Sequence, residues 1–434
     1  MSIVLGVVAD DFTGATDIAN NLVRSGMKCI LLIGVPGSKT DITEADAVVV
    51  ALKSRSCDVN QAINDSVSSV SWLKDQGAKQ IFFKYCSTFD STEKGNIGPV
   101  SDALMKLLVT KQTVFVPAFP ENGRTVYQGN LFVGDRLLNE SGMEQHPLNP
   151  MKDSNVVRLL KSQTQYGVGL INRQLIEQGA QAVRTAMEDL RSEDKCHIVC
   201  DAINDGDLEV LATAVVDLPL VTGGSGLAKA LPHAYRARGW LQDRKQPGYL
   251  SSDSGAQFIL SGSCSRMTLA QLDHFLKDHQ GFPLNPLKLA SEGEAHIAEA
   301  LTFATNNMKR GTPAIIYASA NPQTVEAAQK SLGREKSGEL VENALGELAK
   351  ALVALGTSRL IVAGGESSGA VVSALDIAQL RVGDQIDPGV PWTQTIADGT
   401  SRPLLLALKS GNFGTVDFFS KAFKLLDNPN TGEH

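Results

Sequence analysis

The sequence predicts an α/β protein of two domains, each with a mainly parallel sheet flanked by helices. Short apolar runs bounded by Gly, Asp or Pro alternate with amphipathic stretches along most of the chain. Strands separated by helices of this length form βαβ units and hence parallel sheets. The alternation is broken once, by a charged segment rich in Pro, Gly and Ser. That single break is typical of a linker between two domains.

The front half carries strand-like runs and helical patterns in turn. One predicted helix ends at Gly26 and another at Gly77, as expected for helix C-termini. The predicted helices are 15–25 and 60–76, and the predicted strands are 3–8, 29–33, 47–51, 80–83, 113–116 and 197–200.

The linker composition covers residues 238–256, after which the alternation restarts. We therefore expect domains at 1–245 and 250–434. A second irregular stretch, 143–155, is long enough to be a functional loop or flap. The back half has predicted strands at 257–260, 313–317, 359–363 and 403–409, and predicted helices at 265–277, 292–307 and 338–355.

Composition excludes several classes of protein. The 434 residues are 43% hydrophobic, which is ample for folded cores. The net charge is −7, whereas proteins that bind nucleic acid show a basic footprint. No apolar run approaches the roughly 18 residues of a membrane helix, and no basic leader precedes the first run. We expect a cytoplasmic protein with reduced thiols, without nucleic-acid or membrane partners.

Two carboxylates, Asp10 and Asp11, directly follow the first predicted strand. In an open parallel sheet, ligands bind outside the carboxyl ends of the strands, and the first strand is usually central. One of the two aspartates could simply cap the helix that follows. Capping explains one carboxylate but not both, so we expect at least one of them to act in function.

Cations, carboxylates and hydroxyls follow three further predicted strands of the front half. Arg55, Lys84, Asp90 and Arg124 lie in these segments. Cations at several strand ends suit a small anionic substrate, since Arg binds a carboxylate through two hydrogen bonds. Each residue taken singly could be a solvated loop charge. Together they predict a pocket for a hydroxylated carboxylic acid.

The back half has Gly and Ser where the front half has charge. LSGSCS (260–265), AGGESSGA (363–370) and LKSGNFGT (408–415) each follow a predicted strand, and TGGSGLA (222–228) closes the front half. Free amides at a glycine-rich helix start bind phosphate oxygens, although tight strand–helix turns need Gly anyway. Neither a P-loop nor the dinucleotide fingerprint is present. Glu366 could bind a ribose or magnesium, or could be only a helix-terminal carboxylate.

These motifs resemble those of the four-carbon acid sugar kinase family. Three further segments share the resemblance: ADDFTGATD, KYCSTFDST and PAFPENGRTVYQGNLFVGD. All of them occur in the order typical of the family, from Asp10 to Gly414. KYCSTFDSTEKGNIGPV and HPLNPMKDSN resemble its 3-oxo-tetronate kinase branch. The resemblance implies an acid-sugar-binding N-terminal domain, a nucleotide-binding C-terminal domain and an active site in the cleft between them. It also implies a phosphotransferase with an alcohol acceptor, which uses ATP to phosphorylate the 4-hydroxyl of 3-oxo-tetronate. Many family members have Thr at Ser367; a hydroxyl remains.

The resemblance also assigns residues to ligands. Asp10, Asp11, Arg55, Lys84 and Asp90 are implied to face the acid sugar, and the residue pattern adds Arg124. Mg²⁺ is expected to bridge phosphate oxygens. We expect Asp11, or next Asp10 or Asp90, to accept or orient the hydroxyl proton. The residues implied to contact ATP are Ser261, Ser263, Gly364, Gly365, Glu366, Ser367 and Gly411.

Other functions remain open at this stage. A threonate or erythronate kinase of the same family would share the motifs. A non-catalytic acid-sugar-binding protein would need no nucleotide, and a dehydrogenase would need the fingerprint that is missing. A homodimer is plausible for a protein of this kind.

Overall fold

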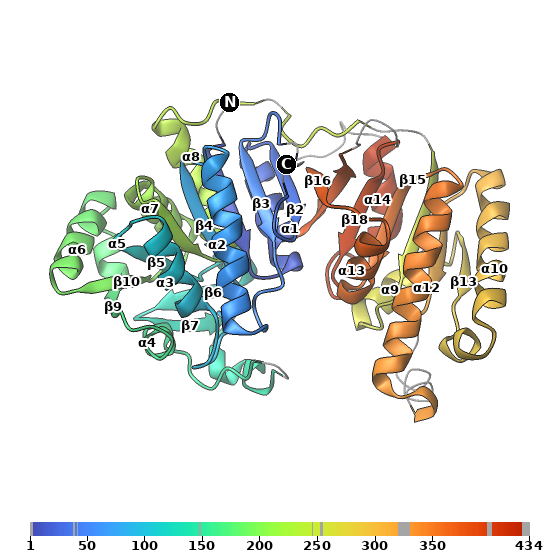
Figure 1. Cartoon of the computed structure of the whole chain (residues 1–434), viewed down its shortest axis with the longest axis horizontal. Coiled ribbons are helices and arrows are strands. Elements are labelled where there is room, and N and C mark those ends of the chain that lie inside the picture. The colour runs from blue at the N-terminus through green and yellow to red at the C-terminus, as the bar shows by residue number, and fades with distance from the viewer. Residues whose placement is uncertain are drawn as a thin grey trace. The chain divides into compact units, whose positions relative to one another are not determined.

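The computed structural model describes residues 3–37, 40, 42–146, 149–244, 246–251, 255–319, 330–396 and 402–427. The chain forms two compact units, Met1–Gly248 and Tyr249–His434. Figure 1 shows both, coloured from blue at the N-terminus to red at the C-terminus. Each unit contains a largely parallel sheet flanked by helices, so the predicted α/β fold is confirmed. The linker prediction falls partly on residues 245 and 252–254, which lie outside the described residues.

The first unit is built on a parallel sheet in which β1 is an interior strand. Its neighbours are β3 on one side and β4 on the other. All five residues of β1 are buried, which explains why the strand reads as a continuous apolar run. The sheet order is β2 (Cys29–Ile33), β3 (Ala47–Ala51), β1 (Leu5–Ala9), β4 (Gln80–Lys84), β11 (Leu220–Gly223), β5 (Thr113–Val116), β10 (Lys195–Cys200) and β9 (Gly167–Ile171).

The chain changes direction across this sheet at β1. The β1–α1–β2 crossover runs toward one edge, and the β3–α2–β4 crossover runs toward the other. Because both crossovers are expected to be right-handed, α1 and α2 cover opposite faces, with α2 in front in Figure 1. The carboxyl end of β1 is therefore a topological switch point, where such sheets bind ligands. The helices are α1 (Phe12–Arg24), α2 (Val59–Asp75), α3 (Ile97–Leu107), α4 (Val156–Lys161), α5 (Arg173–Ile176), α6 (Ala180–Ser192), α7 (Asp205–Val215) and α8 (Ser225–Ala237).

A small antiparallel sheet, which the sequence analysis did not predict, follows β5. It consists of β6 (Arg124–Tyr127), β7 (Asn130–Val133) and β8 (Arg136–Leu137). The predicted flap at 143–155 begins with a 3₁₀ turn, Met143–Gln145, and its residues 147–148 lie outside the described part.

The second unit has its switch point at β12, which lies between β14 and β15. Its sheet is parallel from β13 to β18, and β17 then pairs antiparallel with both β18 and β16. The strand order is β13 (Gln280–Pro283), β14 (Ala314–Tyr317), β12 (Ala256–Ser261), β15 (Thr357–Ala363), β18 (Leu405–Lys409), β17 (Val390–Thr395) and β16 (Gln379–Asp387).

Helices cover this second sheet, and an aromatic core lies against it. Phe275, Trp392 and Phe419 are buried in that core. The indole nitrogen of Trp392 donates to the carbonyl of Ala422, 3.0 Å away, which satisfies a buried donor. The helices are α9 (Arg266–Phe275), α10 (Pro286–Arg310), α12 (Arg334–Ala354), α13 (Gly365–Ala374) and α14 (Phe418–Asp427).

Candidate functional site

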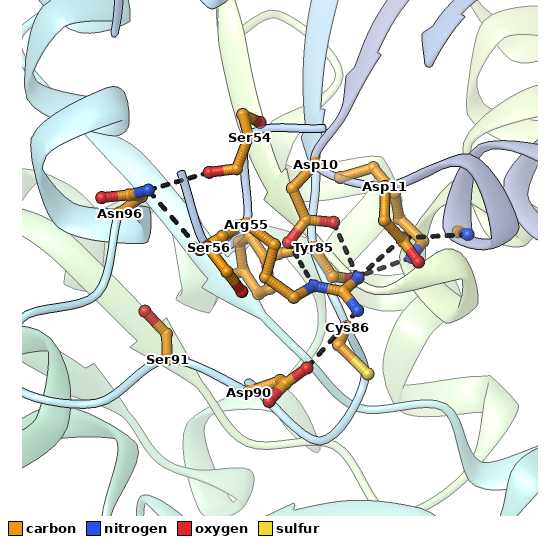
Figure 2. A network of polar contacts seen from close by, with 12 residues as sticks. Asp10, Asp11, Ser54, Arg55, Ser56, Tyr85, Cys86, Asp90, Ser91 and Asn96 are labelled. Carbon is orange, nitrogen blue, oxygen red and sulfur yellow. Dashed lines mark hydrogen bonds and ion pairs between the residues drawn. The ribbon is translucent and has the colours of Figure 1, made fainter. Parts of the chain in front are cut away.

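An ionic cluster lies where β1, β3 and β4 end (Figure 2). Asp10 and Asp11 follow β1, Arg55 follows β3, and Asp90 lies in the loop after β4. The Arg55 guanidinium binds Asp10 through two hydrogen bonds, with Nε to Oδ2 and Nη2 to Oδ1 both at 2.9 Å. This bidentate geometry is the strong form of an Arg–carboxylate pair. The structure therefore brings four of the predicted site residues together.

The other two carboxylates complete the shell around Arg55. Its Nη2 lies 2.7 Å from Oδ1 of Asp11, and its Nη1 lies 3.4 Å from Oδ2 of Asp90. Oδ1 of Asp11 also accepts from the amide of Gly14 at 3.0 Å, so Asp11 is the N-cap of α1. The predicted capping role and the predicted site position thus fall on one residue. Arg55 is the counter-ion of three acids in this structure, which leaves it poorly placed to bind a substrate carboxylate.

Burial and the neighbouring charges set the protonation of this cluster. Burial raises the pKa of Asp10 above its ordinary value, and the Arg55 guanidinium opposes that rise. Burial likewise raises the pKa of Asp90, against the influence of Arg55 and His146. Burial acts to lower the pKa of Arg55, but Asp10 and Asp11 outweigh it and the pKa is raised. The guanidinium therefore stays charged and favours the ionised forms of Asp10 and Asp90.

Backbone contacts hold the loops of the cluster in place. Asn96, at the start of α3, donates from Nδ2 to the carbonyls of Ser54 at 2.8 Å and Cys57 at 3.0 Å. Asp90 has φ 48°, in the left-handed region that non-glycine residues rarely adopt. Such backbone conformations cluster at functional sites. Sequence reasoning did not single out Asn96, although it lies within the KGNIGPV part of a quoted motif.

One oxygen of Asp90 lacks a hydrogen bond from the described residues, and Asn149 of the 143–155 segment is near enough to lower the pKa of this carboxyl. Oδ1 is buried and accepts no hydrogen bond from the residues that the structure describes. Nδ1 of His146 lies 3.8 Å from it, in the segment predicted to be a flap. A buried acceptor without a partner costs free energy, and a substrate hydroxyl would satisfy it.

Lys84 provides a cation beside the cluster. It is the last residue of β4, is 3% exposed, and donates from Nζ to the carbonyl of Tyr85 at 2.9 Å. A Cβ on Gly14 would lie 2.9 Å from this Nζ, so the ammonium sits against the start of α1. Over the described ranges, Lys84 enters no ion pair within 4.0 Å. Its charge acts on the carboxyls of Asp17 and Asp10, whose pKa values it lowers against the effect of burial.

Arg124 is not part of this cluster. It begins β6 in the small antiparallel sheet, and its Nη1 donates to the carbonyl of Asn122. No hydrogen bond or ion pair joins it to Asp10, Asp11 or Asp90 among the described residues.

The Gly/Ser turns of the second unit come together because their strands are neighbours. The turns follow β12, β15 and β18, which are adjacent and parallel. The amide of Gly262 donates to the carbonyl of Ala363 at 3.1 Å, and that of Gly364 donates to the carbonyl of Lys409 at 2.8 Å. All three turns are thus tied to one another at the carboxyl edge of the sheet.

The start of α13 suits a phosphate group. No side chain caps this helix, and Gly364 before it has φ 127°, which favours glycine. The first amides of a helix have no partner within the helix, so they can donate to phosphate oxygens. A Cβ added to Gly365 would meet open space, and Glu366 is exposed in the first turn.

The predicted serines differ in how accessible their hydroxyls are. Ser261 is fully buried, and its Oγ lies 2.7 Å from Oγ of Ser319. Ser263 is half-buried, and its Oγ accepts from the amide of Ser265 at 3.3 Å. Ser367 is buried at the start of α13, where its Oγ would lie 2.2 Å from a Cβ on Gly262. Ser263 is therefore the serine best placed to meet a ligand.

No group of three His, Cys, Asp or Glu side chains suited to a metal ion occurs in the described part of the chain. No helix of that part is both long and apolar enough to cross a membrane.

Comparison with known proteins assigns a ligand class to each unit. Residues 5–231 match the model of a sugar-binding N-terminal domain, and residues 258–419 match that of a nucleotide-binding C-terminal domain. The chain is 52% identical to a 3-oxo-tetronate kinase of Pseudomonas fluorescens, over 96% of both chains. It is 51% identical to one of Burkholderia multivorans, over 98% of this chain and 97% of that protein.

Two solved structures share the fold of this chain over nearly its full length. A Salmonella typhimurium protein described as a tRNA synthase has a TM-score of 0.89 at 44% identity, covering 96% of this chain and 98% of that one. A Haemophilus influenzae protein has a TM-score of 0.86 at 41% identity, covering 97% of this chain and all of that one.

These matches define a protein with one sugar-binding and one nucleotide-binding domain. The chain belongs to the four-carbon acid sugar kinase family, and the resemblance inferred from its motifs is confirmed. Within the family, four relatives at 49–52% identity are named 3-oxo-tetronate kinases.

Proposed function

We propose that this protein is an ATP-dependent kinase that phosphorylates the 4-hydroxyl of 3-oxo-tetronate. The observation that carries the proposal is the identity of about half of its residues with 3-oxo-tetronate kinases over nearly the full length. The ionic cluster of the first unit suits a hydroxylated acid, and the uncapped, glycine-opened turns of the second unit suit a triphosphate.

In the proposed mechanism the protein positions groups and neutralises charge, as phosphoryl transfer requires. Lys84 binds the substrate carboxylate, since Arg55 is enclosed by its three acids. Asp11 accepts the proton of the attacking hydroxyl: its side chain is 30% exposed, against 5% for Asp10 and 7% for Asp90. Both hydrogen bonds of Asp11 in the described chain use Oδ1, which leaves Oδ2 for the substrate.

Asp90 and Arg55 support this chemistry. Oδ1 of Asp90 accepts a hydrogen bond from a second substrate hydroxyl. Arg55 favours the ionised form of Asp10 and fixes Asp10 and Asp11 in orientation.

The nucleotide phosphates are held by backbone amides at the start of α13 and by the turns containing Ser263 and Gly411. Mg²⁺ bound to the phosphate oxygens would neutralise their charge, and protein carboxylates need not form a separate metal site for this. The cytoplasmic location and the homodimer stay predictions from the sequence.

A phosphorylation assay tests the proposed function. The chain is incubated with Mg-ATP and, separately, with threonate, erythronate and the 3-oxo form of each acid, and the position of the phosphate is determined by NMR. We expect turnover to be fastest with a 3-oxo acid and the phosphate to lie on O4. Preference for threonate or erythronate would place the protein in another branch of the family. Absence of turnover with all four acids would favour a non-catalytic acid-sugar-binding protein.

A further inference from the structure

A buried ammonium lies beneath the turn that follows β18. Lys409 is the last residue of that strand and its side chain is fully buried. Nζ donates to Oγ1 of Thr268 at 3.1 Å and to the carbonyls of Ser410 at 3.1 Å and Gly411 at 2.9 Å. All three acceptors are neutral. A buried charge without a counter-ion is costly, so its retention needs a reason.

No acid on the neighbouring elements compensates this charge. Arg359 of β15 pairs with Asp427, and Glu366 of α13 is exposed. β17 carries no charged residue. Lys409 forms no ion pair with any of them in the described ranges, and burial alone lowers the pKa of its ammonium to about 8. The charged residues of α9 and α13, the two helices near it, are Arg266, Asp273, His274 and Glu366.

Lys409 is also the residue that joins the three Gly/Ser turns. The carbonyl of Gly411 accepts from Nζ of Lys409 and from the hydroxyls of Ser265 at 2.6 Å and Thr268 at 2.8 Å. Ser265 is the N-cap of α9, so these bonds fix the Gly411 turn to the turn after β12. The carbonyl of Lys409 accepts from the amide of Gly364, in the turn after β15.

We propose that Lys409 is the positioning residue of the nucleotide site: its ammonium pins the Gly411 turn to α9 and places a positive charge beneath the turn that meets the nucleotide phosphates. This inference rests on the proposed function, because it takes the ligand of these turns to be a nucleotide. A phosphate group would provide the missing negative charge, and the amides of the pinned turns would orient it.

The test compares Lys409→Met, Lys409→Arg and, as a matched control, Lys424→Met, which removes an exposed lysine of α14. Binding of Mg-ADP and of adenosine to the full-length chain is measured by calorimetry. We expect the methionine variant to bind Mg-ADP about tenfold or more weakly and adenosine normally. The arginine variant should stay within about threefold of wild type, and the control should match wild type. Normal Mg-ADP binding by Lys409→Met, or an equal loss for adenosine, would overturn the proposal.

The pH dependence of Mg-ADP affinity gives a second measurement, which a merely structural role of Lys409 would leave unchanged. The ammonium is charged below its pKa of about 8, so Mg-ADP affinity of the wild type should fall as pH rises through that value. The arginine variant stays charged and should show a flat profile between pH 7.5 and 9.5. Parallel profiles for the two proteins would contradict the proposal, even if the methionine variant does not fold. A wild-type chain that binds no adenine nucleotide at all would instead refute the proposed function.

Discussion

Asp11 is both a helix cap and a charged carboxylate of the ionic cluster, and a single substitution can separate these two roles. Its carboxylate caps α1 through Gly14 and pairs with Arg55. Asn caps helices as well as Asp does, so Asp11→Asn keeps the cap and removes the charge. We expect kcat to fall about a hundredfold or more, the usual contribution of a general base, while nucleotide binding stays unchanged. Steady-state kinetics and calorimetry with Mg-ADP measure the two effects.

Asp58→Asn is the matched control for this variant. Asp58 caps α2 through the amides of Asn60 and Gln61 and is exposed. Wild-type kinetics are expected for it. Near-normal turnover of Asp11→Asn would remove Asp11 from the role of base and leave Asp90 as the next carboxylate to test.

Arg55 is expected to act on the pH dependence of the reaction. Burial raises the pKa of Asp10 and Asp90, and Arg55 opposes the rise in both. Arg55→Met removes that opposition, so the pKa values of Asp10 and Asp90 should rise further. Since the proposed mechanism needs ionised carboxylates, the acid limb of the kcat/KM profile should move to higher pH. The control is Lys53→Met, which removes an exposed cation from the same loop. An acid limb at the same pH in both variants would contradict the role given to Arg55.

At the scale of residues, the sequence predicted which side chains gather but not how they pair. The positions of Asp10, Arg55 and Asp90 after strands follow from strand order, which a local pattern reveals. The enclosure of Arg55 by three acids depends on loop conformations, including the left-handed backbone of Asp90, which no pattern encodes. The sequence analysis did not single out Lys409, because a lysine at the end of a strand is usually solvated.

At the scale of elements, the role of the turn before α13 in nucleotide binding can be tested by adding one methyl group at Gly364. Gly364 has φ 127°, and a Cβ there would lie 2.9 Å from Oγ of Ser367 and 3.3 Å from the amide nitrogen of Ser263. Gly364→Ala should therefore strain the turn by about 1–3 kcal/mol and raise the Kd for Mg-ATP roughly 5- to 150-fold. Acid-sugar binding should be unaffected. Calorimetry with each ligand measures both.

A second glycine of α13 provides the control. Gly369 has no atom within 4 Å of an added Cβ, so Gly369→Ala should bind nucleotide normally. It should also stabilise the fold by about 0.5–1 kcal/mol, the helix-interior difference between Gly and Ala. Equal nucleotide affinities for Gly364→Ala and Gly369→Ala would show that the turn before α13 does not hold the phosphates.

Element prediction succeeded where burial on both faces leaves a continuous apolar run. Residues 29–33, 47–51 and 113–116 were predicted as strands and form β2, β3 and β5 with the same bounds. The β6–β8 sheet was missed because its strands are short and mix polar with apolar residues. The antiparallel β16–β17 pair was missed because only long-range pairing, and not local periodicity, distinguishes it from irregular chain.

At the scale of the whole molecule, the two units repeat one design with different chemistry. Each sheet has a switch point at its first strand, β1 in the first unit and β12 in the second, where neighbouring crossovers run toward opposite edges. At the first switch point the chain places acids and cations, and at the second it places Gly and Ser. The two switch points thus differ in residue type, and this difference agrees with the sugar-binding and nucleotide-binding domain models that the two units match.

This division predicts that each ligand protects its own unit against amide hydrogen exchange. A ligand at a hundredfold excess over its Kd stabilises the state that binds it by about 2.7 kcal/mol. In the full-length chain, Mg-ADP should slow exchange mainly in the turns 261–265, 364–368 and 409–414, which lie in the second unit. The acid sugar should instead slow exchange at 10–14, 54–57 and 84–91 in the first unit. Mass spectrometry of peptic peptides resolves these segments, with adenosine as a control that lacks phosphate. Protection of the 10–14 segment by Mg-ADP, with the three turns unchanged, would show that the ligand assignment of the two units is reversed.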